Sequence, residues 1–550
     1  MKPFQVFKNF TRLERLIFIA AFLLFSIAAV FLFIRLVEEK TTTVPVAGGD
    51  YTEGVVGQPS FINTILAGND ADRDLIKLAF SNLLDLSESH KINDDGKSWT
   101  VRLKENLFWT DGEPITSDDV IFTIKTIQDP DSNSPSLANW QGIAAERVSE
   151  KEIKFTLPIS YAFFENVLQE LYPAPKHIFG NIPAANLRLS AYNFEPVGSG
   201  KFKFVAAEKQ RDGFITEYQF ERNGNYAGQK TYLDRFNVKF FSNENDLVDA
   251  FNSGKLSGFG GIEPDKLEKI KINYQIRSLR MPRYYAVFIN QNNSPALKDV
   301  NVRLALNYAT DRKRIIQDVF GNRAISANGP ITPGTEGFDA NVNPEENFSL
   351  EKAEKILNAS GWQLMNGDIR EKAVDKNQTE QLKFQLIVPD IQFLKKTAEL
   401  LKEDWAKIGA ELNLQVLSLS EINQNAIRTR NYEMILFGNN IGKSPDLFSF
   451  WHSSERFYPG LNLSLYENKT VDGLINSIRK DFNEGRRAQK LATLQSMIME
   501  DQPAVFLYSP NYLYAAKNGL SGFDEKYIPT ASDRFQNVEK WYIKTARVFK

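Results

Sequence analysis

The 550-residue sequence contains no cysteine. This absence excludes disulfide bonds, thiolate catalysis, cysteine zinc sites and a lipid tether attached through a cysteine side chain. Histidine is also scarce: His90, His177 and His452 lie far apart, and none has a second histidine three or four residues away. The paired histidines typical of a helical zinc site are therefore missing, and we expect no metal or other cofactor.

Signals for nucleic-acid binding and for catalysis are missing as well. The 66 basic and 68 acidic residues nearly cancel, so no basic footprint for nucleic acid is expected. No G-x-S-x-G nucleophile elbow occurs. The segment Pro196–Phe202 superficially resembles a phosphate-binding loop, but Glu195 and Phe202 replace the glycine and the Ser/Thr which that loop requires. We interpret it as a turn between strands and predict that the protein is not an enzyme.

One long apolar run is present near the N-terminus. Residues Leu16–Ile34 form a run of 19 residues without a charge, which is long enough to span a hydrocarbon core as a helix. Lysine and arginine residues precede the run, and Glu38 and Glu39 follow it, so the positive-inside rule places the N-terminus in the cytoplasm. A cleaved signal peptide would have a shorter apolar region and a small-residue cleavage site, and a retained anchor is therefore the favoured interpretation. Residues 41–50 are small and polar, which predicts a flexible stalk.

The rest of the chain is long enough for two or three domains, and 42% of all residues are hydrophobic. Strand and helix patterns alternate along it, with strand–helix–strand units between about 380 and 440 that indicate an α/β lobe. Predicted strands are Ser98–Leu103, Lys201–Glu208, Asn237–Ser242, Arg283–Asn290, Gln381–Pro389 and Glu411–Leu419; predicted helices are Val300–Phe320, Ser349–Gly361 and Lys395–Gly409.

The stretch Phe108–Lys125 concentrates acidic residues around a glycine and a proline. Its Asp-Gly-Glu-Pro sequence is typical of a turn. Thr116 or Ser117 can cap the helix that follows, and Asp119 lies three residues after Thr116, as in a capping box. Acidic residues in a first helical turn also interact favourably with the helix dipole. We therefore interpret these carboxylates as architecture.

Taken with other segments, this stretch resembles the family 5 extracellular solute-binding proteins, the oligopeptide, dipeptide and nickel receptors of ABC importers. The pattern F-x-DG-x-P-x-T-x-DV-x-F matches Phe108–Phe122, and the family's N-P-V-G-T-G-P-Y-x-F segment is similar to Glu195–Phe204. Further matches run in order along residues 51–510. They are Glu53–Leu66, Ala71–Leu84, Phe220–Gly228, Tyr285–Asn290, Leu297–Ile315, Ala353–Trp362 and Leu400–Leu412.

The resemblance implies an α/β, two-lobed, periplasmic-binding-protein-like fold of type II, the Venus-flytrap fold. It has an extra subdomain in the first lobe, and here one N-terminal transmembrane helix precedes it. The expected organisation follows the chain in five parts. These are a cytoplasmic N-terminus at 1–15, a membrane anchor or uncleaved signal at 16–35, a linker at 36–49, lobe I at 50–284 plus 505–550 with its subdomain at about 85–185, and lobe II at 285–504.

The resemblance also indicates where a ligand would lie. In peptide-binding members an aspartate, in a segment similar to Phe437–Trp451, holds the peptide's amino group. Asn440 stands in its place here, and an amide offers a hydrogen bond without the negative charge. A free-amine peptide is thereby put in doubt, whereas a peptide gripped through its backbone, a blocked peptide or another small solute stays open. The expected ligand-binding residues are Gly57, Gln58, Phe61, Trp140, Tyr284, Tyr285, Arg428, Asn439, Asn440, Gly442 and Trp451.

The resemblance implies a monomeric, membrane-tethered receptor outside the cytoplasm. It would capture short peptides or another small solute by hinge closure and deliver them to ABC permease and ATPase subunits. Two alternatives stay open: a binding or sensing module that is not coupled to import, and an exported hydrolase. The hydrolase would need a nucleophile or metal site that the sequence does not indicate.

Overall fold

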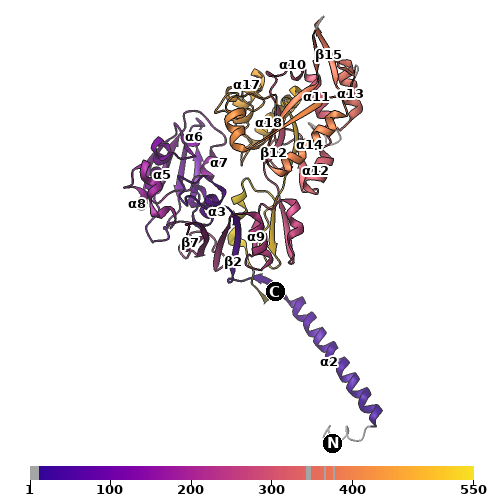
Figure 1. The fold of residues 1–550 in the computed structure, drawn as a ribbon. Coiled ribbons are helices and arrows are strands. Elements are labelled where there is room, and N and C mark those ends of the chain that lie inside the picture. Colours follow the sequence, from indigo (N-terminus) through magenta and orange to yellow (C-terminus); the bar gives the residue numbers. More distant parts are fainter. Residues whose placement is uncertain (1–10, 342–347, 365–366, 376–377) are drawn as a thin grey trace.

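The computed structural model describes residues 11–341, 348–364, 367–375 and 378–550. It shows two lobes, a subdomain beside the first lobe, and one long helix that extends away from them (Figure 1). This arrangement confirms the expected α/β two-lobed fold with an apolar N-terminal helix. Helix α2, Arg12–Lys40, is long and apolar enough to cross a membrane, and none of its residues is buried.

Lobe I is built on a seven-stranded sheet in the order β11-β21-β10-β2-β9-β8-β7. Its inner face buries Tyr51, Phe236 and Trp541, whose rings pack against one another. The strands are β2 (Asp50–Val56), β7 (Phe202–Lys209), β8 (Ile215–Arg222), β9 (Arg235–Phe241), β10 (Gly258–Gly260), β11 (Tyr274–Leu279) and β21 (Tyr512–Lys517); the helices are α3 (Asp70–Ala79) and α9 (Glu244–Asn252).

The subdomain lies at the side of lobe I and carries a four-stranded antiparallel sheet, in the order β3-β4-β6-β5. Trp99, Phe155 and Phe164 pack edge-on in its core. Its strands are β3 (Ser87–Ile92), β4 (Ser98–Leu103), β5 (Ala144–Ser149) and β6 (Glu152–Thr156); its helices are α4 (Leu83–Leu86), α5 (Ser117–Gln128), α6 (Leu137–Trp140), α7 (Phe164–Gln169) and α8 (Lys176–Phe179).

Lobe II has a six-stranded sheet in the order β13-β20-β12-β19-β17-β18. Strand β17 (Lys383–Pro389) runs parallel to β18 (Glu411–Leu417) and β19 (Met434–Asn440), which confirms the predicted α/β units. The other strands are β12 (Arg283–Ile289), β13 (Ala324–Ser326) and β20 (Ala504–Pro510). The helices are α10 (Pro295–Lys298), α11 (Val300–Tyr308), α12 (Arg312–Phe320), α13 (Leu350–Ala359), α14 (Gln392–Ala406), α15 (Leu419–Glu421), α16 (Phe448–Trp451), α17 (Lys469–Ile478) and α18 (Glu484–Asp501).

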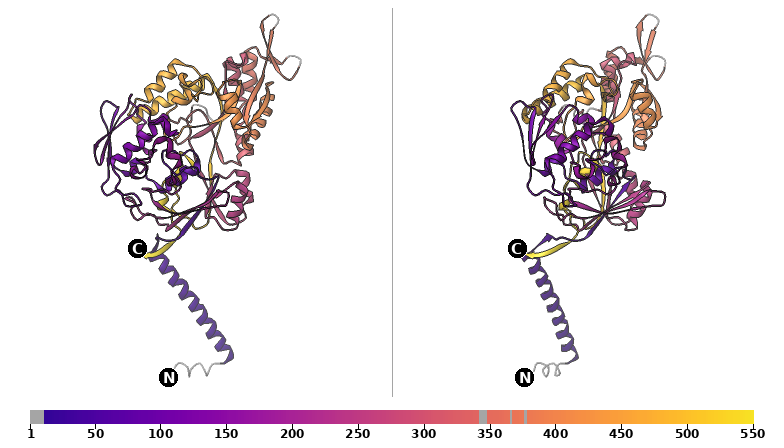
Figure 2. Two further views of the ribbon diagram at one scale, coloured as in Figure 1. Left: turned by 60° about the vertical axis from the view of Figure 1, so that its left-hand side comes forward. Right: turned by 90° about the vertical axis from the view of Figure 1, so that its left-hand side faces the viewer.

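A small three-stranded sheet extends lobe II at the end far from α2 (Figure 2). Its strands are β14 (Gln363–Leu364), β15 (Arg370–Asp375) and β16 (Gln378–Gln381). The predicted helix Val300–Phe320 is divided into α11 and α12. The division lies at Asp311, whose side chain accepts a hydrogen bond from the backbone N–H of Arg314 and thereby caps a new helix.

The chain passes between the lobes twice. Residues 280–282 connect β11 of lobe I to β12 of lobe II, and Asn511 connects β20 of lobe II to β21 of lobe I. The return to lobe I therefore falls at residue 511, after the predicted boundary at 505, because β20 pairs with β12 and β13. The two connections lie side by side, since β20 is the direct neighbour of β12 and β21 of β11.

The predicted flexible stalk is ordered structure. Helix α2 continues to Lys40, and β1 (Thr41–Pro45) follows at once and pairs with the C-terminal strand β22 (Thr545–Phe549). The small polar composition of residues 41–50 suggested a flexible linker, but Thr41, Thr42 and Thr43 are good strand residues once a partner strand is available.

Candidate functional site

A cavity of about 330 Å³ lies between the two lobes, beside the two connections. Lobe I contributes the loop that follows β10, and lobe II contributes the start of β12, the end of α12 and the first turn of α14. The connection at Asn511 completes the wall. The lining residues are Gly261, Ile262, Glu263, Pro264, Asp265, Arg283, Tyr285, Val319, Phe320, Gln392, Phe393, Lys396, Pro510, Asn511, Tyr512 and Leu513.

Aromatic rings form much of the lobe II wall. Tyr285 and Phe393 meet edge-on with their ring centres 5.2 Å apart, and Phe320 lies 5.7 Å from Phe393. Behind them Tyr508 packs against both Tyr285 and Phe320. Aromatic walls of this kind supply contact area and tolerate varied apolar groups, because they do not depend on specific hydrogen bonds.

The cavity also carries charges that the protein leaves largely uncompensated. Among the described residues, Nε of Arg283 is buried and has no hydrogen-bond partner. Lys396 donates a hydrogen bond to the backbone carbonyl of Asp318 and forms no ion pair with any carboxylate that the structure describes. On the lobe I side, Glu263 is partly buried, and burial together with the neighbouring carboxylates Glu244 and Asp265 raises its pKa. Positive charge therefore gathers on the lobe II wall and negative charge on the lobe I wall.

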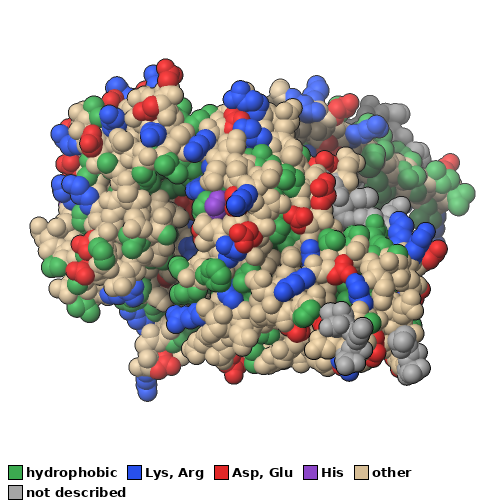
Figure 3. Space-filling view, turned by 90° about the horizontal axis from the view of Figure 1, so that it is seen from above, with side chains coloured by type: hydrophobic (Ala, Val, Ile, Leu, Met, Phe, Trp, Pro, Cys, Tyr) green, Lys and Arg blue, Asp and Glu red, His purple; other side chains and the backbone are tan. Residues whose placement is uncertain are grey.

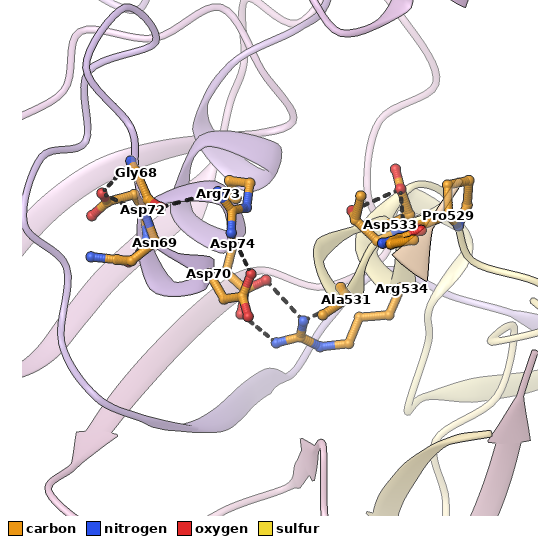
Figure 4. A network of polar contacts seen from close by, with 12 residues as sticks. Gly68, Asn69, Asp70, Asp72, Arg73, Asp74, Pro529, Ala531, Asp533 and Arg534 are labelled. Atoms are coloured by element: carbon orange, nitrogen blue, oxygen red, sulfur yellow. Dashed lines mark hydrogen bonds and ion pairs between the residues drawn. The ribbon is translucent and has the colours of Figure 1, made fainter. Parts of the chain in front are cut away.

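A second cavity of about 330 Å³ adjoins the first, with which it shares Gly261, Ile262, Glu263 and Tyr512. Its floor is the end of β2 and the start of α3. Asp74 and Arg534 are also lining residues, and Arg534 donates two hydrogen bonds to Asp74, of 2.8 and 2.6 Å (Figure 4). It donates a third, of 3.0 Å, to Glu53. All three side chains are almost fully buried.

The buried network continues into the core of lobe I. Tyr514 donates to Glu53, and Tyr51 and Tyr514 share a hydrogen bond of 2.6 Å. Burial raises the pKa of Glu53 to about 7, although Arg534 and the Tyr514 hydroxyl both act to lower it. Nearby, the buried Lys77 donates to Asp533 at 2.7 Å. These charges are mutually satisfied, so they hold α3 to the C-terminal segment and are not available to a ligand.

Lobe II also contacts lobe I and the subdomain across the opening between them. Tyr161 of the subdomain donates a 2.8 Å hydrogen bond to Asp446, which also accepts one of 3.1 Å from Arg479. Beside the connections, Asn440 donates to the carbonyl of Pro529 at 3.5 Å. Burial of Asp446 is intermediate, and the Arg479 guanidinium covers the Tyr161 ring at 5.0 Å.

Two of the expected ligand-binding residues lie at the interlobe cavity or its edge. Tyr285 lines the cavity directly. Asn440 ends β19, is exposed, and pairs in register with Arg283 of β12, so it lies beside the cavity's guanidinium. Gly442 adopts a positive φ of 67° in the turn after Asn440, and its N–H donates to the Asn440 side chain.

Four expected residues belong to packed cores, which corrects the prediction that they face a ligand. Trp140 is 3% exposed in the subdomain core. In lobe II the buried hydroxyl of Tyr284 accepts hydrogen bonds from Asn439 at 3.0 Å and from Trp451 at 3.3 Å. These side chains satisfy one another, as buried polar groups must.

The remaining expected residues lie outside the two adjoining cavities. Gly57 follows the cavity-lining end of β2, with a φ of 94°. Gln58 accepts a 2.9 Å hydrogen bond from the backbone N–H of Ile215. Phe61 packs against the lobe I core beneath Arg188. Arg428 is exposed and covers the ring of Tyr458, away from the cavity lining.

The acidic stretch Phe108–Lys125 has the predicted architecture. Thr116 caps α5 and forms a capping box with Asp119, and Asp119 also accepts from the backbone N–H of Lys176. Within the described residues, no cluster of His, Asp and Glu is arranged to hold a metal ion. The predicted turn between strands at Pro196–Phe202 is wrong, because the segment connects a 3-10 helix (Ala191–Asn193) to β7. Its glycine has a packing reason, since a side chain at Gly198 would collide with the backbone of Ala79.

Sequence reasoning missed most of the residues that line the cavity, among them Arg283, Phe393, Lys396 and Glu263. Arg283 and Tyr512 each stand at the first position of a strand that follows a crossing between lobes. These positions lie directly beside the crossings, where the two lobes meet, so a residue next to a predicted crossing was the available signal.

Two lobes joined by two adjacent crossings, with a cavity between them lined from both sides, define the class of solute-binding receptors. The model of the bacterial extracellular solute-binding proteins, family 5, matches residues 84–457, and the chain belongs to this family. It is therefore an extracytoplasmic solute-binding protein of the ABC importer type and not an enzyme.

The chain is similar to the oligopeptide-binding protein AppA of Bacillus subtilis, with 28% identity over 92% of this chain and 93% of AppA. The structure of AppA in complex with a nonapeptide superposes with a TM-score of 0.70, at 26% identity over 91% of this chain and 100% of that one. The ABC transporter substrate-binding protein CtaP of Listeria monocytogenes gives a TM-score of 0.77, with 27% identity and coverage of 90% and 99%. NikZ of Campylobacter jejuni, in complex with Ni(L-His), shares the fold with a TM-score of 0.69 at 24% identity, covering 90% of this chain and 99% of NikZ.

Proposed function

We propose that the protein is a membrane-tethered receptor that captures short peptides between its lobes and delivers them to an ABC permease. The observation that carries this proposal is the interlobe cavity, which has aromatic walls and charges of opposite sign on its two sides. The complex of the related AppA with a nonapeptide supports peptide as the ligand class. Because a structurally similar protein, NikZ, is in complex with Ni(L-His), the relatives alone do not identify the ligand class. The charges of this cavity are the evidence from the chain itself.

A zwitterion fits the distribution of charge. Arg283 lines the cavity, and its buried Nε has no hydrogen-bond partner among the described residues, so its guanidinium suits a carboxylate; Lys396 lies on the same wall. Glu263 and Asp265 on the facing wall suit an ammonium group. A ligand that contacts both walls favours the closed arrangement of the lobes, because its affinity for that arrangement is the greater.

We also propose that Asn440, Gly442 and the loop at Gly57 contact the ligand. The side-chain amide of Asn440 lies beside Arg283 and donates a hydrogen bond to the carbonyl of Pro529 in lobe I. An amide binds a peptide through neutral hydrogen bonds, so we propose that the peptide backbone is recognised there and that the ammonium group is held elsewhere.

We further propose that α2 is retained as a single membrane span, with the N-terminus in the cytoplasm and both lobes outside. The helix has 29 residues, about 43 Å at 1.5 Å per residue, and it extends past the apolar run at both ends. It is directly continuous with β1, so cleavage near residue 45 would remove a strand that the C-terminus pairs with. We expect the protein to be monomeric.

The ligand class can be tested by native mass spectrometry of the full-length protein purified in detergent, followed by calorimetric titration with synthetic peptides of two to nine residues. We expect co-purified masses that match a peptide series, and binding that weakens when the peptide's carboxylate is amidated. Binding only of metal complexes, or catalytic turnover abolished by one side-chain substitution, would contradict the proposal.

Coupling to import needs a separate experiment, since a sensor that does not feed a transporter would bind peptides equally well. Uptake of a labelled peptide that binds the purified protein should be lost in cells lacking this receptor and restored by the full-length chain. Unchanged uptake in those cells would favour the sensing alternative.

A further inference from the structure

The two ends of the extracytoplasmic chain meet at the base of the molecule. Strand β22 runs antiparallel to β1, with Thr41 opposite Phe549 and Pro45 opposite Thr545. The backbone N–H of Lys550 donates to the carbonyl of Lys40, the last residue of α2, at 2.9 Å. In every view the C-terminus lies beside the end of α2 (Figures 1 and 2). The last strand therefore points back along the chain toward the proposed membrane span.

The height of this ribbon above the bilayer follows from helix geometry. Leu36 and Val37 are the last apolar residues of α2, and Thr41 comes four residues after Val37, a rise of about 6 Å. The headgroup region extends roughly 5 to 7 Å beyond the hydrocarbon core on each side. Phe549, opposite Thr41, is thus at the level of the lipid headgroups if α2 spans the membrane.

The side chains at this end of β22 suit that level. Phe549 is 83% exposed, and Val548 is also exposed to solvent. Lys40 and Lys550 carry positive charge beside them, while Arg547 lies 3.7 Å from Glu38. Aromatic side chains favour the interface between lipid and water, and lysine side chains reach from it to the headgroup phosphates.

We propose that Phe549 and Lys550 form a second membrane contact, in which the C-terminal end of β22 rests on the lipid headgroups of the outer leaflet. This inference rests on the proposed retention of α2 as a membrane span. The β1·β22 ribbon then links the base of lobe I to the bilayer at two points, which holds the lobes upright above the membrane at a fixed distance.

The absence of cysteine allows a clean test. Lys550→Cys, in the full-length chain reconstituted in lipid nanodiscs, is labelled with a fluorophore and exposed to quenchers attached to lipid headgroups. The matched control is Thr545→Cys, at the far end of the same strand and also exposed. We expect at least about twofold stronger quenching at 550 than at 545, because the interfacial zone is only a few ångströms deep. Phe549→Ser in the Lys550→Cys background should reduce the difference.

A disulfide pair checks the ribbon separately. Thr43→Cys with Arg547→Cys joins residues directly opposite in the strand pair, so it should form a disulfide readily, whereas Thr43→Cys with Thr545→Cys should not. Equal quenching at 550 and 545 with the first disulfide formed would overturn the lipid contact. Extraction of the unmodified chain from membranes by alkaline carbonate would instead overturn the retained anchor, and the lipid contact with it.

Discussion

The two adjoining cavities each contain a buried arginine nitrogen, and the two arginines differ in whether the described residues provide them with hydrogen-bond partners. In the wall of the second cavity, Arg534 is 2% exposed and forms hydrogen bonds with both Asp74 and Glu53. In the first cavity, Arg283 has a buried Nε for which the described part of the chain provides no partner. Both are guanidinium groups at the interlobe face, but only one is satisfied by the protein itself.

The difference separates charges that hold the fold from charges available to a ligand. A buried charge without a partner is costly, so the protein keeps Arg534 only because two carboxylates surround it. The Arg283 side chain is only partly buried, so water can hydrate the exposed part of its guanidinium until a ligand displaces that water. At the surface seen from above, acidic and basic side chains are mixed, and this face shows no basic patch (Figure 3). The charges that indicate where a ligand binds are therefore those inside the cavities, such as Arg283, and not those on this surface.

The largest expected effect comes from breaking the satisfied group. Arg534→Met removes the partner of two buried carboxylates and should lower the free energy of unfolding by about 3–5 kcal/mol. Urea denaturation followed by circular dichroism measures this. The control is Lys395→Met, which removes an exposed pair with Asp390 and should cost less than about 1 kcal/mol. Equal losses in the two variants would contradict the role assigned to Arg534.

Removing the unsatisfied guanidinium should act on binding instead. Arg283→Met should weaken the binding of a peptide with a free carboxylate by roughly 10- to 100-fold, the value of a charge-assisted hydrogen bond of about 1.5–3 kcal/mol. The free energy of unfolding should change little, because no described residue forms a hydrogen bond with the Nε of Arg283. Titration calorimetry with the free and the amidated peptide checks this, since the amidated peptide should bind both forms with nearly equal affinity.

The pH dependence of stability should report on Glu53. Its pKa is about 7 in the folded protein against 4.5 for an ordinary glutamate, so the native state binds this proton more tightly than the unfolded chain does. Its contribution to stability is therefore greatest below pH 4.5 and is lost as the pH rises to about 7. Between pH 5 and 7.5 the free energy of unfolding of Glu53→Gln should fall less than that of the wild type, by about 1–2 kcal/mol. Parallel curves for the two proteins would show that Glu53 is ionised throughout.

The smallest expected effect concerns the neighbour of Arg283. Asn440→Asp places a negative charge beside the Arg283 guanidinium, so it should weaken the binding of peptides with a free carboxylate by about 5- to 10-fold, roughly 1 kcal/mol in an exposed position. C-terminally amidated peptides should lose nothing. Unchanged affinity for both kinds of peptide would remove Asn440 from the site.

The architecture could be predicted from the sequence further than the site could. Strand patterns such as Ser98–Leu103 are local, and the alternation of buried and exposed residues is enough to find them. The cavity instead joins residues near 262, 283, 320, 393 and 511, which only the packing of the lobes brings together. Aromatic residues were ambiguous for the same reason: Tyr284 and Tyr285 are consecutive in a strand, so one enters the core and the other the cavity. The predicted stalk failed because its partner strand is the last in the chain.

Strand β21 lies between β10 and the edge strand β11 of the lobe I sheet, although it comes almost at the end of the chain. During export the N-terminal part of the chain crosses the membrane first. The edges of β10 and β11 that pair with β21 therefore stay unpaired until more than 200 further residues, which include all of lobe II, have crossed. Lobe II is continuous in sequence and is free to fold first. Lobe I, and with it the interlobe cavity, is completed only when residues 512–517 arrive, so a receptor truncated before that point has one finished lobe and no binding site.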